Sequence, residues 1–282
     1  MRLECMDPKY GSSRLRKGLS KRGLVFYAAL VLTGLFLIAA ASSKLYSEQH
    51  EDFEARSEYD QLRDLFSTAT ARQVSGNEPG NAEQRADEQA ELENQNLYIE
   101  DTGAPGSDRP DAMVFLTGIN PDFVGWISNG DDIDYPVVRG SDNDHYLSTT
   151  FSGTRNPAGA IFMDYRIAQG FDAPLCILYG HNMRDGSMFA SLNRYADPEY
   201  SEEHSEVIIT TPEGKTLVYK VFETRLADMQ DTSYEIDNPE NASTNQAFDG
   251  EPAGAGRYLL LSTCTPGADR AERMLVFAEL VN

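Results

Sequence analysis

The chain has 282 residues and a formal net charge of −21, enough for one sizeable domain with accessory segments. Its first 22 residues hold seven Lys or Arg against two acidic residues, so the remainder is even more acidic than the whole. Such a surface repels phosphate backbones, which argues against nucleic acid as a partner. Cys5, Cys176 and Cys264 leave no plausible pair, so no disulfide scaffold is predicted.

Residues 23–41 are uncharged and predict a transmembrane helix. At about 1.5 Å per residue they span roughly 28 Å, close to the hydrocarbon thickness of a bilayer. The basic residues all precede this stretch, which predicts a cytoplasmic tail over residues 1–22 and an extracellular remainder. A signal peptide cleaved near residues 39–41 is the alternative. The apolar stretch is longer than the ~7–15 residues of such signals, which favours an uncleaved single-pass anchor.

Residues 42–111 are predicted to separate this anchor from a globular domain. Residues 46–70 are charged, with apolar residues at spacings of three and four, and predict a juxtamembrane helix or stalk. Residues 73–110 are rich in Gly, Pro, Asn, Gln and acidic residues. They lack the apolar surface that offsets chain entropy, and are therefore predicted to form a disordered spacer.

Residues 112–282 read as one mainly β domain. Eight short apolar runs are separated by turn residues, which predicts an all-β barrel or sandwich. Helical segments are minor, over residues 187–195 and 198–204, and residues 238–256 are predicted to be a loop. A hairpin turn is predicted over residues 210–215. The predicted strands cover residues 123–127, 135–138, 160–163, 175–179, 206–210, 217–222, 258–261 and 274–277.

Cys264 is the candidate nucleophile because it ends the run at residues 258–264 and has no disulfide partner. Arg273 opens the next apolar run, and a hairpin-like return would bring it to the same end of the sheet. A guanidinium there favours the thiolate and can donate to an oxyanion. The alternatives are that Arg273 is a surface charge at a strand start, or that Arg270 takes its place.

His181 is the candidate partner, since it follows the run at residues 175–179 directly. If that strand neighbours the cysteine strand, the two side chains form a Cys/His pair. The other histidines are weaker candidates: His145 lies in a polar turn, and His50 and His204 are predicted to be solvated surface. No residues have metal-ligand spacing and no Gly-rich phosphate loop is present, so no metal or cofactor is predicted.

At these residues the chain resembles the sortase family. The sequence LSTC at 261–264 with the following Arg273 resembles the sortase cysteine signature, and YGHNM at 179–183 resembles the histidine motif. The resemblance covers about residues 115–222 and 257–282, and further stretches resemble class B sortases. It implies an eight-stranded sortase β-barrel with short helices, preceded by a transmembrane helix, in a membrane-bound enzyme of a Gram-positive bacterium. The stretches that resemble class B sortases are NPDFVGWI at 120–127, IDYPVV at 133–138, GSDN at 140–143 with YL at 146–147, GAIFMD at 159–164 and DGSMF at 185–189.

The resemblance also implies a reaction. Cys264 attacks the Thr carbonyl in the C-terminal sorting signal of a secreted protein, His181 protonates the leaving amine, and Arg273 steadies the substrate and oxyanion. An amine of a peptidoglycan precursor then resolves the thioacyl-enzyme. By similarity, the groove for the signal is lined by Asn143, Leu147, Ser262 and Thr263. A plain core leucine at 147 and an ordinary strand hydroxyl at 262 are the alternatives.

The chain departs from the family pattern at two places, and three other functions are alternatives. Residues 223–257 are polar and short where class B members usually carry a longer, helical insertion, and Pro266 stands where some members have an acid. A pilin-polymerising sortase would use the same catalytic residues with a pilin lysine as acceptor. A cell-wall cysteine peptidase or amidase often places Cys before His, unlike this chain. A non-catalytic adhesion module would leave the grouping of Cys264, His181 and Arg273 unexplained.

Overall fold

The computed structural model describes residues 21–76, 111–228, 231–234, 256–265 and 272–281. The chain divides into two compact units, Met1–His50 and Glu51–Asn282. The predicted basic tail, apart from its last two residues, and most of the predicted spacer at 73–110 and of the predicted loop at 238–256 lie outside the described residues.

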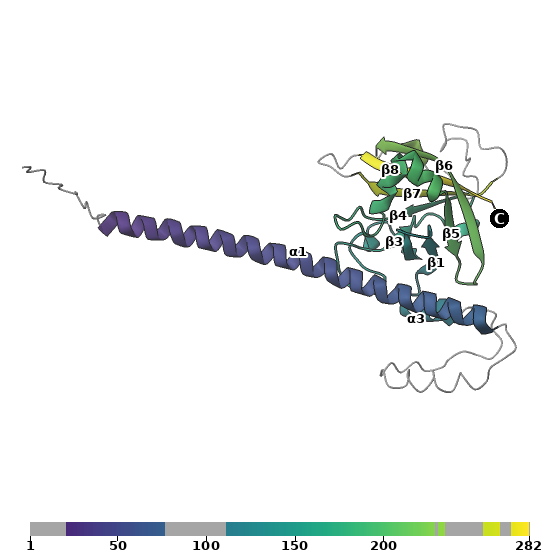
Figure 1. The fold of residues 1–282 in the computed structure, drawn as a ribbon, viewed down its shortest axis with the longest axis horizontal. Coiled ribbons are helices and arrows are strands. Elements are labelled where there is room, and N and C mark those ends of the chain that lie inside the picture. The colour runs from purple at the N-terminus through teal and green to yellow at the C-terminus, as the bar shows by residue number, and fades with distance from the viewer. Residues whose placement is uncertain (1–20, 77–110, 229–230, 235–255, 266–271, 282) are drawn as a thin grey trace, which may run out of the picture. The chain divides into compact units, whose positions relative to one another are not determined.

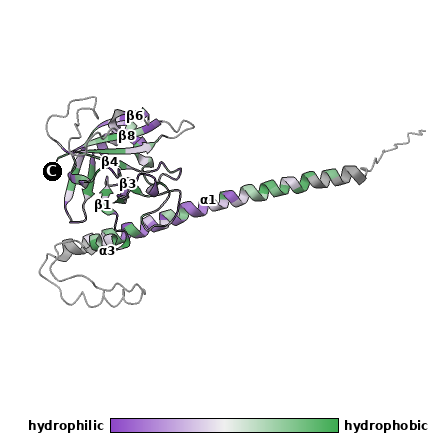
Figure 2. Ribbon diagram, turned by 180° about the vertical axis from the view of Figure 1, so that it is seen from behind, coloured by the Kyte–Doolittle hydropathy of each residue, from purple (hydrophilic) through white to green (hydrophobic). Residues whose placement is uncertain are grey.

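Helix α1 runs over Lys21–Gly76 and contributes to both units. Its stretch Leu30–Thr70 includes a window apolar enough to cross a membrane, and none of that window is buried. Figure 2 shows the apolar residues concentrated in the N-terminal half of α1, where the anchor at 23–41 is predicted. From residue 51 onward the helix belongs to the same unit as the barrel, and three of its residues join the core: Ala55, Tyr59 and Leu62.

The second unit is built on a closed barrel with the strand order β1-β2-β3-β4-β7-β8-β6-β5 (Figure 1). Each predicted strand corresponds to one observed strand, so the eight-stranded barrel is confirmed. The largest difference is β6, which continues six residues past the apolar run that predicted it. The strands are β1 (Phe123–Ser128), β2 (Asp134–Val138), β3 (Ile161–Met163), β4 (Leu175–Tyr179), β5 (Glu206–Thr210), β6 (Thr216–Asp228), β7 (Tyr258–Cys264) and β8 (Glu272–Leu280).

Burial explains why some of these strands are continuous apolar runs and others are not. In β4 and β7 every residue except the last is buried, as is usual for strands that pair in parallel and are covered on both faces. β5 and β6 form the predicted antiparallel hairpin. Over its first half β6 alternates between buried and more exposed residues, because one face is open to solvent.

Helical segments are short and lie between strands. α4 (Pro198–Glu203) begins where predicted, with the Asp197 side chain accepting from the Glu199 backbone N–H and Pro198 in the first turn. The segment predicted at 187–195 overlaps a 3₁₀ helix, η4 (Ala190–Ala196). The sequence analysis did not predict α3 (Asp111–Ile119). The other 3₁₀ helices are η2 (His145–Leu147), η3 (Gly170–Asp172) and η5 (Thr232–Tyr234).

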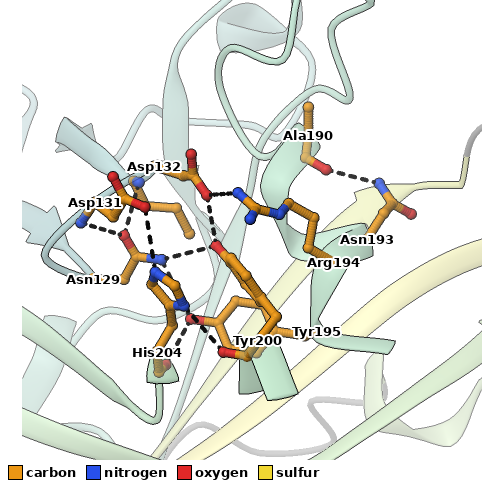
Figure 3. A network of polar contacts seen from close by, with 10 residues as sticks. Asn129, Asp131, Asp132, Ala190, Asn193, Arg194, Tyr195, Tyr200 and His204 are labelled. Carbon is orange, nitrogen blue, oxygen red and sulfur yellow. Dashed lines mark hydrogen bonds and ion pairs between the residues drawn. The ribbon is translucent and has the colours of Figure 1, made fainter. Parts of the chain in front are cut away.

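His204 corrects one prediction. It was expected to be solvated, but its side chain is only 13% exposed. Its ring stacks on Tyr200 with 4.0 Å between centroids, and its Nδ1 lies 3.0 Å from the Tyr200 carbonyl oxygen. The Tyr200 hydroxyl donates to Asp132, which also binds Arg194 (Figure 3). This network joins the β1–β2 turn to η4 and α4.

Leucine-to-alanine changes test the barrel core. Leu260 at the middle of β7 is 0% exposed, whereas Leu226 on β6 is 57% exposed. Leu260→Ala is expected to lower the free energy of unfolding by about 3 kcal/mol, through lost burial and an unfilled cavity. The matched control Leu226→Ala should stay within about 0.5 kcal/mol of wild type. Urea unfolding followed by fluorescence of Trp126, the single tryptophan, measures both. Equal effects would contradict this core.

Candidate active site

Strand pairing brings His181 and Cys264 to one rim of the barrel. β4 and β7 run parallel with Tyr179 opposite Ser262. His181 and Cys264 each lie two residues further along, so both extend from the same end of adjacent strands. The two strands are thus neighbours, as a Cys264/His181 pair requires. Across the next ladder, Cys264 lies opposite Arg273 on β8.

Cys264 is a free, partly exposed thiol, and the Nη1 of Arg273 donates to its Sγ. The guanidinium thus places a hydrogen-bond donor and a positive charge beside the sulfur, and the thiolate is the nucleophilic form of cysteine. Cys176 is different, because complete burial raises the pKa of its thiol and keeps it protonated. The competing Arg270 lies outside the described residues.

The imidazole of His181 is oriented by a backbone carbonyl. Its Nε2 lies 2.7 Å from the Leu147 oxygen, and a carbonyl can only accept, so Nε2 carries a proton in this contact. In the neutral ring Nδ1 is then the atom that can take up a proton, and in the imidazolium it can release one.

Gly180, between β4 and His181, is required by close packing. A glycine at this place could serve a sharp turn of the backbone. Gly180 is not among the glycines with positive φ, however, and a Cβ here would lie 2.5 Å from Ile161 Cδ1 and 2.7 Å from Phe189. The Phe189 backbone N–H donates to the His181 carbonyl at 2.9 Å, so the packing at Gly180 fixes the path of the histidine segment.

Polar contacts continue the β4–β7 ladder past the strand ends. Gly180 N–H donates to the Ser262 carbonyl at 3.2 Å, and the Thr263 hydroxyl donates to the Gly180 carbonyl at 2.8 Å. Asn182 Nδ2 donates to the Cys264 carbonyl at 2.9 Å. Asn182 was not predicted as a site residue, although Asn182 directly follows His181 in the sequence. These contacts tie the histidine segment to the cysteine strand.

A cavity of about 490 Å³ opens at this rim. All seven residues predicted from the sequence line it: His181, Cys264, Arg273, Asn143, Leu147, Ser262 and Thr263. Five further residues line the same cavity and were not predicted as site residues: Asp144, Phe162, Tyr179, Gly180 and Tyr234.

Beneath the cavity, the fully buried carboxylate of Asp164 forms a hub. Arg166 donates to both of its oxygens, at 2.9 and 2.8 Å. Burial would raise the pKa of Asp164, but the hydrogen bonds and charge of Arg166 more than offset it and hold the pKa below its usual value. The carboxylate therefore stays ionised and acts as an acceptor.

This hub holds cavity residues from three segments. Asn143 Nδ2 and the Tyr179 hydroxyl each donate to Asp164 Oδ2 at 3.0 Å. Burial and the charge of Asp164 raise the pKa of Tyr179, so its phenol remains a donor. Arg166 Nη2 also donates to the Tyr234 carbonyl at 3.2 Å. The Tyr234 hydroxyl lies 2.7 Å from Ser262 Oγ. Four lining residues, Asn143, Tyr179, Tyr234 and Ser262, thus belong to one connected polar network.

The described residues contain no cluster of His, Cys, Asp or Glu suited to a metal ion. The barrel and cavity define the class of protein: a β-barrel that presents a cysteine, a histidine and an arginine from adjoining strands to one cavity.

Comparison with known proteins identifies the family. The sortase domain matches residues 129–281. Sortase B of Listeria monocytogenes is 33% identical over 184 residues, which cover 61% of this chain and 74% of that protein. A solved Bacillus anthracis structure, described as similar to sortase B, is 25% identical with a TM-score of 0.57, covering 81% of this chain and 96% of that one. A class B sortase of Streptococcus pyogenes involved in pilus biogenesis is 25% identical with a TM-score of 0.51, covering 59% and 96%.

The chain therefore belongs to the sortase family, and its relatives place it in class B. Sortases are transpeptidases, so membership implies an enzyme of this kind.

Substituting Gly180 tests the close packing beside His181. Gly180→Ala places a methyl group against Ile161 and Phe189, and should lower the free energy of unfolding by about 1–3 kcal/mol. Gly118→Ala is the control, because nothing lies within 4 Å of a Cβ at that position of α3. Urea unfolding should show the control unchanged or slightly more stable. Equal tolerance of both alanines would contradict the packing described.

Asp164→Asn tests the hub through its pH dependence. Because the pKa of Asp164 lies below its ordinary 3.8, ionised Asp164 stabilises the fold above pH 3.8, and this stability is lost as pH falls through the folded pKa. The variant should be less stable by about 2 kcal/mol at neutral pH. The difference should shrink below about pH 4.

Asp172→Asn supplies the control, since Asp172 is 78% exposed in its ion pair with Arg257. It should change stability little at either pH. A pH-independent loss in Asp164→Asn would show that packing, rather than charge, carries the effect.

Proposed function

We propose that the chain cleaves a C-terminal sorting signal after Thr and joins the released protein to an amine of a peptidoglycan precursor. One observation carries this proposal: Cys264, His181 and Arg273 extend from the same rim of three adjoining strands into one cavity. Thr263, Ser262, Asn143 and Leu147 line that cavity and would contact the signal.

The first half-reaction forms a thioacyl-enzyme. The Cys264 thiolate attacks the Thr carbonyl carbon, a C–S bond forms, and negative charge moves to the carbonyl oxygen. The guanidinium of Arg273, next to the sulfur, stabilises both the thiolate and this oxyanion. As the C–N bond breaks, His181 Nδ1 gives its proton to the leaving amine.

The second half-reaction transfers the acyl group. An incoming amine attacks the thioester, neutral His181 accepts the amine proton at Nδ1, and the Cys264 thiolate leaves. One amide replaces another, so no external energy source and no cofactor are required.

The apolar part of α1 supports a position at the cell surface. We infer that residues 23–41 anchor the chain in the cell membrane, with residues 1–22 cytoplasmic. Residues 112–282 would then form the extracellular catalytic domain, and residues 42–111 would connect it to the anchor. Secreted proteins would meet the enzyme as they leave the membrane.

Pilin polymerisation is the second candidate, favoured by the similarity to the Streptococcus pyogenes sortase of pilus biogenesis. It differs in the acceptor, which would be a lysine side chain of a pilin subunit. The catalytic steps and the three catalytic residues would be the same.

Ligation assays test these proposals. The full chain in detergent is incubated with a peptide library carrying Thr at a fixed position, together with either triglycine or a lysine peptide with a blocked N-terminus. Mass spectrometry should show Thr joined to triglycine. Cys264→Ala or His181→Ala should lower the rate at least about 10³-fold. Cys176→Ala, at a buried thiol away from the cavity, should stay active.

Three other results would change the assignment. Preference for the lysine peptide would favour pilin polymerisation. Hydrolysis without ligation at every amine concentration would favour a peptidase or amidase. Activity retained in Cys264→Ala would overturn the proposed nucleophile.

A further inference from the structure

The part of α1 that belongs to the barrel unit, Glu51–Gly76, touches both segments that hold His181. One is the segment 182–189, which follows His181 along the chain. The other is the segment 144–159, whose Leu147 carbonyl accepts from the imidazole.

The first contact joins Arg56 to the segment after His181. Arg56 Nε donates to the Asp185 carboxylate at 2.5 Å, and Nη2 donates to the Asp185 carbonyl at 2.8 Å. The two partners are 129 residues apart in sequence. The Arg56 side chain is 49% exposed, and such pairs contribute little to stability. A bidentate grip on side chain and backbone does, however, fix where the segment lies.

A second contact reaches the same segment through Tyr135. The Tyr135 hydroxyl accepts from the Met188 N–H at 3.0 Å, while the Tyr59 ring packs edge-on against Tyr135 at 5.4 Å. Met188 has a φ of 59°, the one positive value at a non-glycine among the described residues. This left-handed conformation costs on the order of 1 kcal/mol and persists only where surrounding contacts impose it. Met188 also bridges to Asn182, the residue after His181.

A third contact reaches His181 from the side of Leu147. The Tyr59 hydroxyl donates to the Gly159 carbonyl at 2.6 Å. Gly159 has a φ of +58°, and a Cβ there would lie 2.3 Å from the Tyr146 carbonyl oxygen and 3.0 Å from Leu147 backbone atoms. The Tyr59 hydrogen bond therefore holds Gly159 in close contact with the backbone of Tyr146 and Leu147. The Leu147 carbonyl is the one that accepts from the imidazole.

We propose that Arg56 and Tyr59 are positioning residues for His181, so that α1 sets the orientation of the general acid and base. The assignment of that role to His181 rests on the proposed function. α1 contacts both segments that hold the imidazole, 182–189 through Arg56 and 144–159 through Tyr59. Cys264 and Arg273 are held by the β4–β7–β8 ladders, which do not include α1. Loosening α1 should therefore displace His181 while leaving the nucleophile in place.

The test compares variants of the full chain in detergent. Arg56→Gln should lower kcat for ligation about 10-fold with KM within about twofold, because misplacing a proton-transfer group slows chemistry more than binding. Tyr59→Phe, which keeps the ring packing, should lower kcat in the same way. Arg56→Lys should recover part of the loss. Gln61→Ala is the matched control, since Gln61 is exposed on the same helix and donates to Ser57.

A second measurement does not require turnover. The rate of Cys264 alkylation by iodoacetamide, followed by mass spectrometry of its peptide, should vary with pH through the charge of His181. His181→Ala should remove the part of that dependence that comes from the imidazole and leave the part that comes from ionisation of the Cys264 thiol itself. Arg56→Gln and Tyr59→Phe should shift the midpoint of the imidazole part, and Gln61→Ala should not. Hydrogen exchange in segment 182–189 should be faster in Arg56→Gln alone among these helix variants.

The outcomes separate this proposal from the proposed function. If wild type ligates nothing but the alkylation profile shifts as described, the positioning role stands and the transpeptidase assignment falls. If the profiles of Arg56→Gln and Tyr59→Phe match those of wild type and Gln61→Ala, the positioning role is overturned. It is also overturned if kcat, KM and the unfolding midpoint all change together, since that would show a merely structural role.

Discussion

The parallel pairing of β4 with β7 is the constraint on which the site depends. These strands are far apart in sequence, yet their register alone decides that His181 and Cys264 leave the sheet side by side. A slip of one residue would turn every side chain of β7 to the opposite face and remove the thiol from the cavity. Because both strands are covered on both faces, they need nearly continuous apolar sequence.

Polar contacts beyond the strand ends hold the segment that carries His181 next to the strand that carries Cys264. Gly180 exchanges hydrogen bonds with Ser262 and Thr263, and the Asn182 amide closes onto the Cys264 carbonyl. The histidine segment is thus continuous with the ladder in its hydrogen bonding, although it is no longer a strand. For the proposed mechanism this matters, because a base on a free loop would have to find its nucleophile at each turnover, whereas this arrangement fixes the orientation of His181 in advance.

The strands, and the position of Cys264, His181 and Arg273 at strand ends, could be predicted because their signals are local. An apolar run that ends in Cys264 or leads to His181 is readable from adjacent residues. The Asp164 hub could not be predicted, since an acid followed two residues later by Arg166 looks like an exposed turn, and only the fold buries it. The prediction for His204 was wrong because its acidic neighbours in sequence suggested an exposed position. In the fold its ring packs on Tyr200, four residues earlier. Arg56 and Asp185 carry no periodic signal that would join them across the sequence.

The Asp164 hub also holds a residue of the segment 223–257 at the cavity. Tyr234, from the polar segment 223–257, lines the cavity. Two links hold it there: the Arg166 guanidinium on its carbonyl, and its own hydroxyl on Ser262. Arg166 is in turn fixed by Asp164, whose other donors are Asn143 and Tyr179. One buried carboxylate therefore links Asn143 and Tyr179 directly, and Tyr234 through Arg166, and all three of these residues line the cavity.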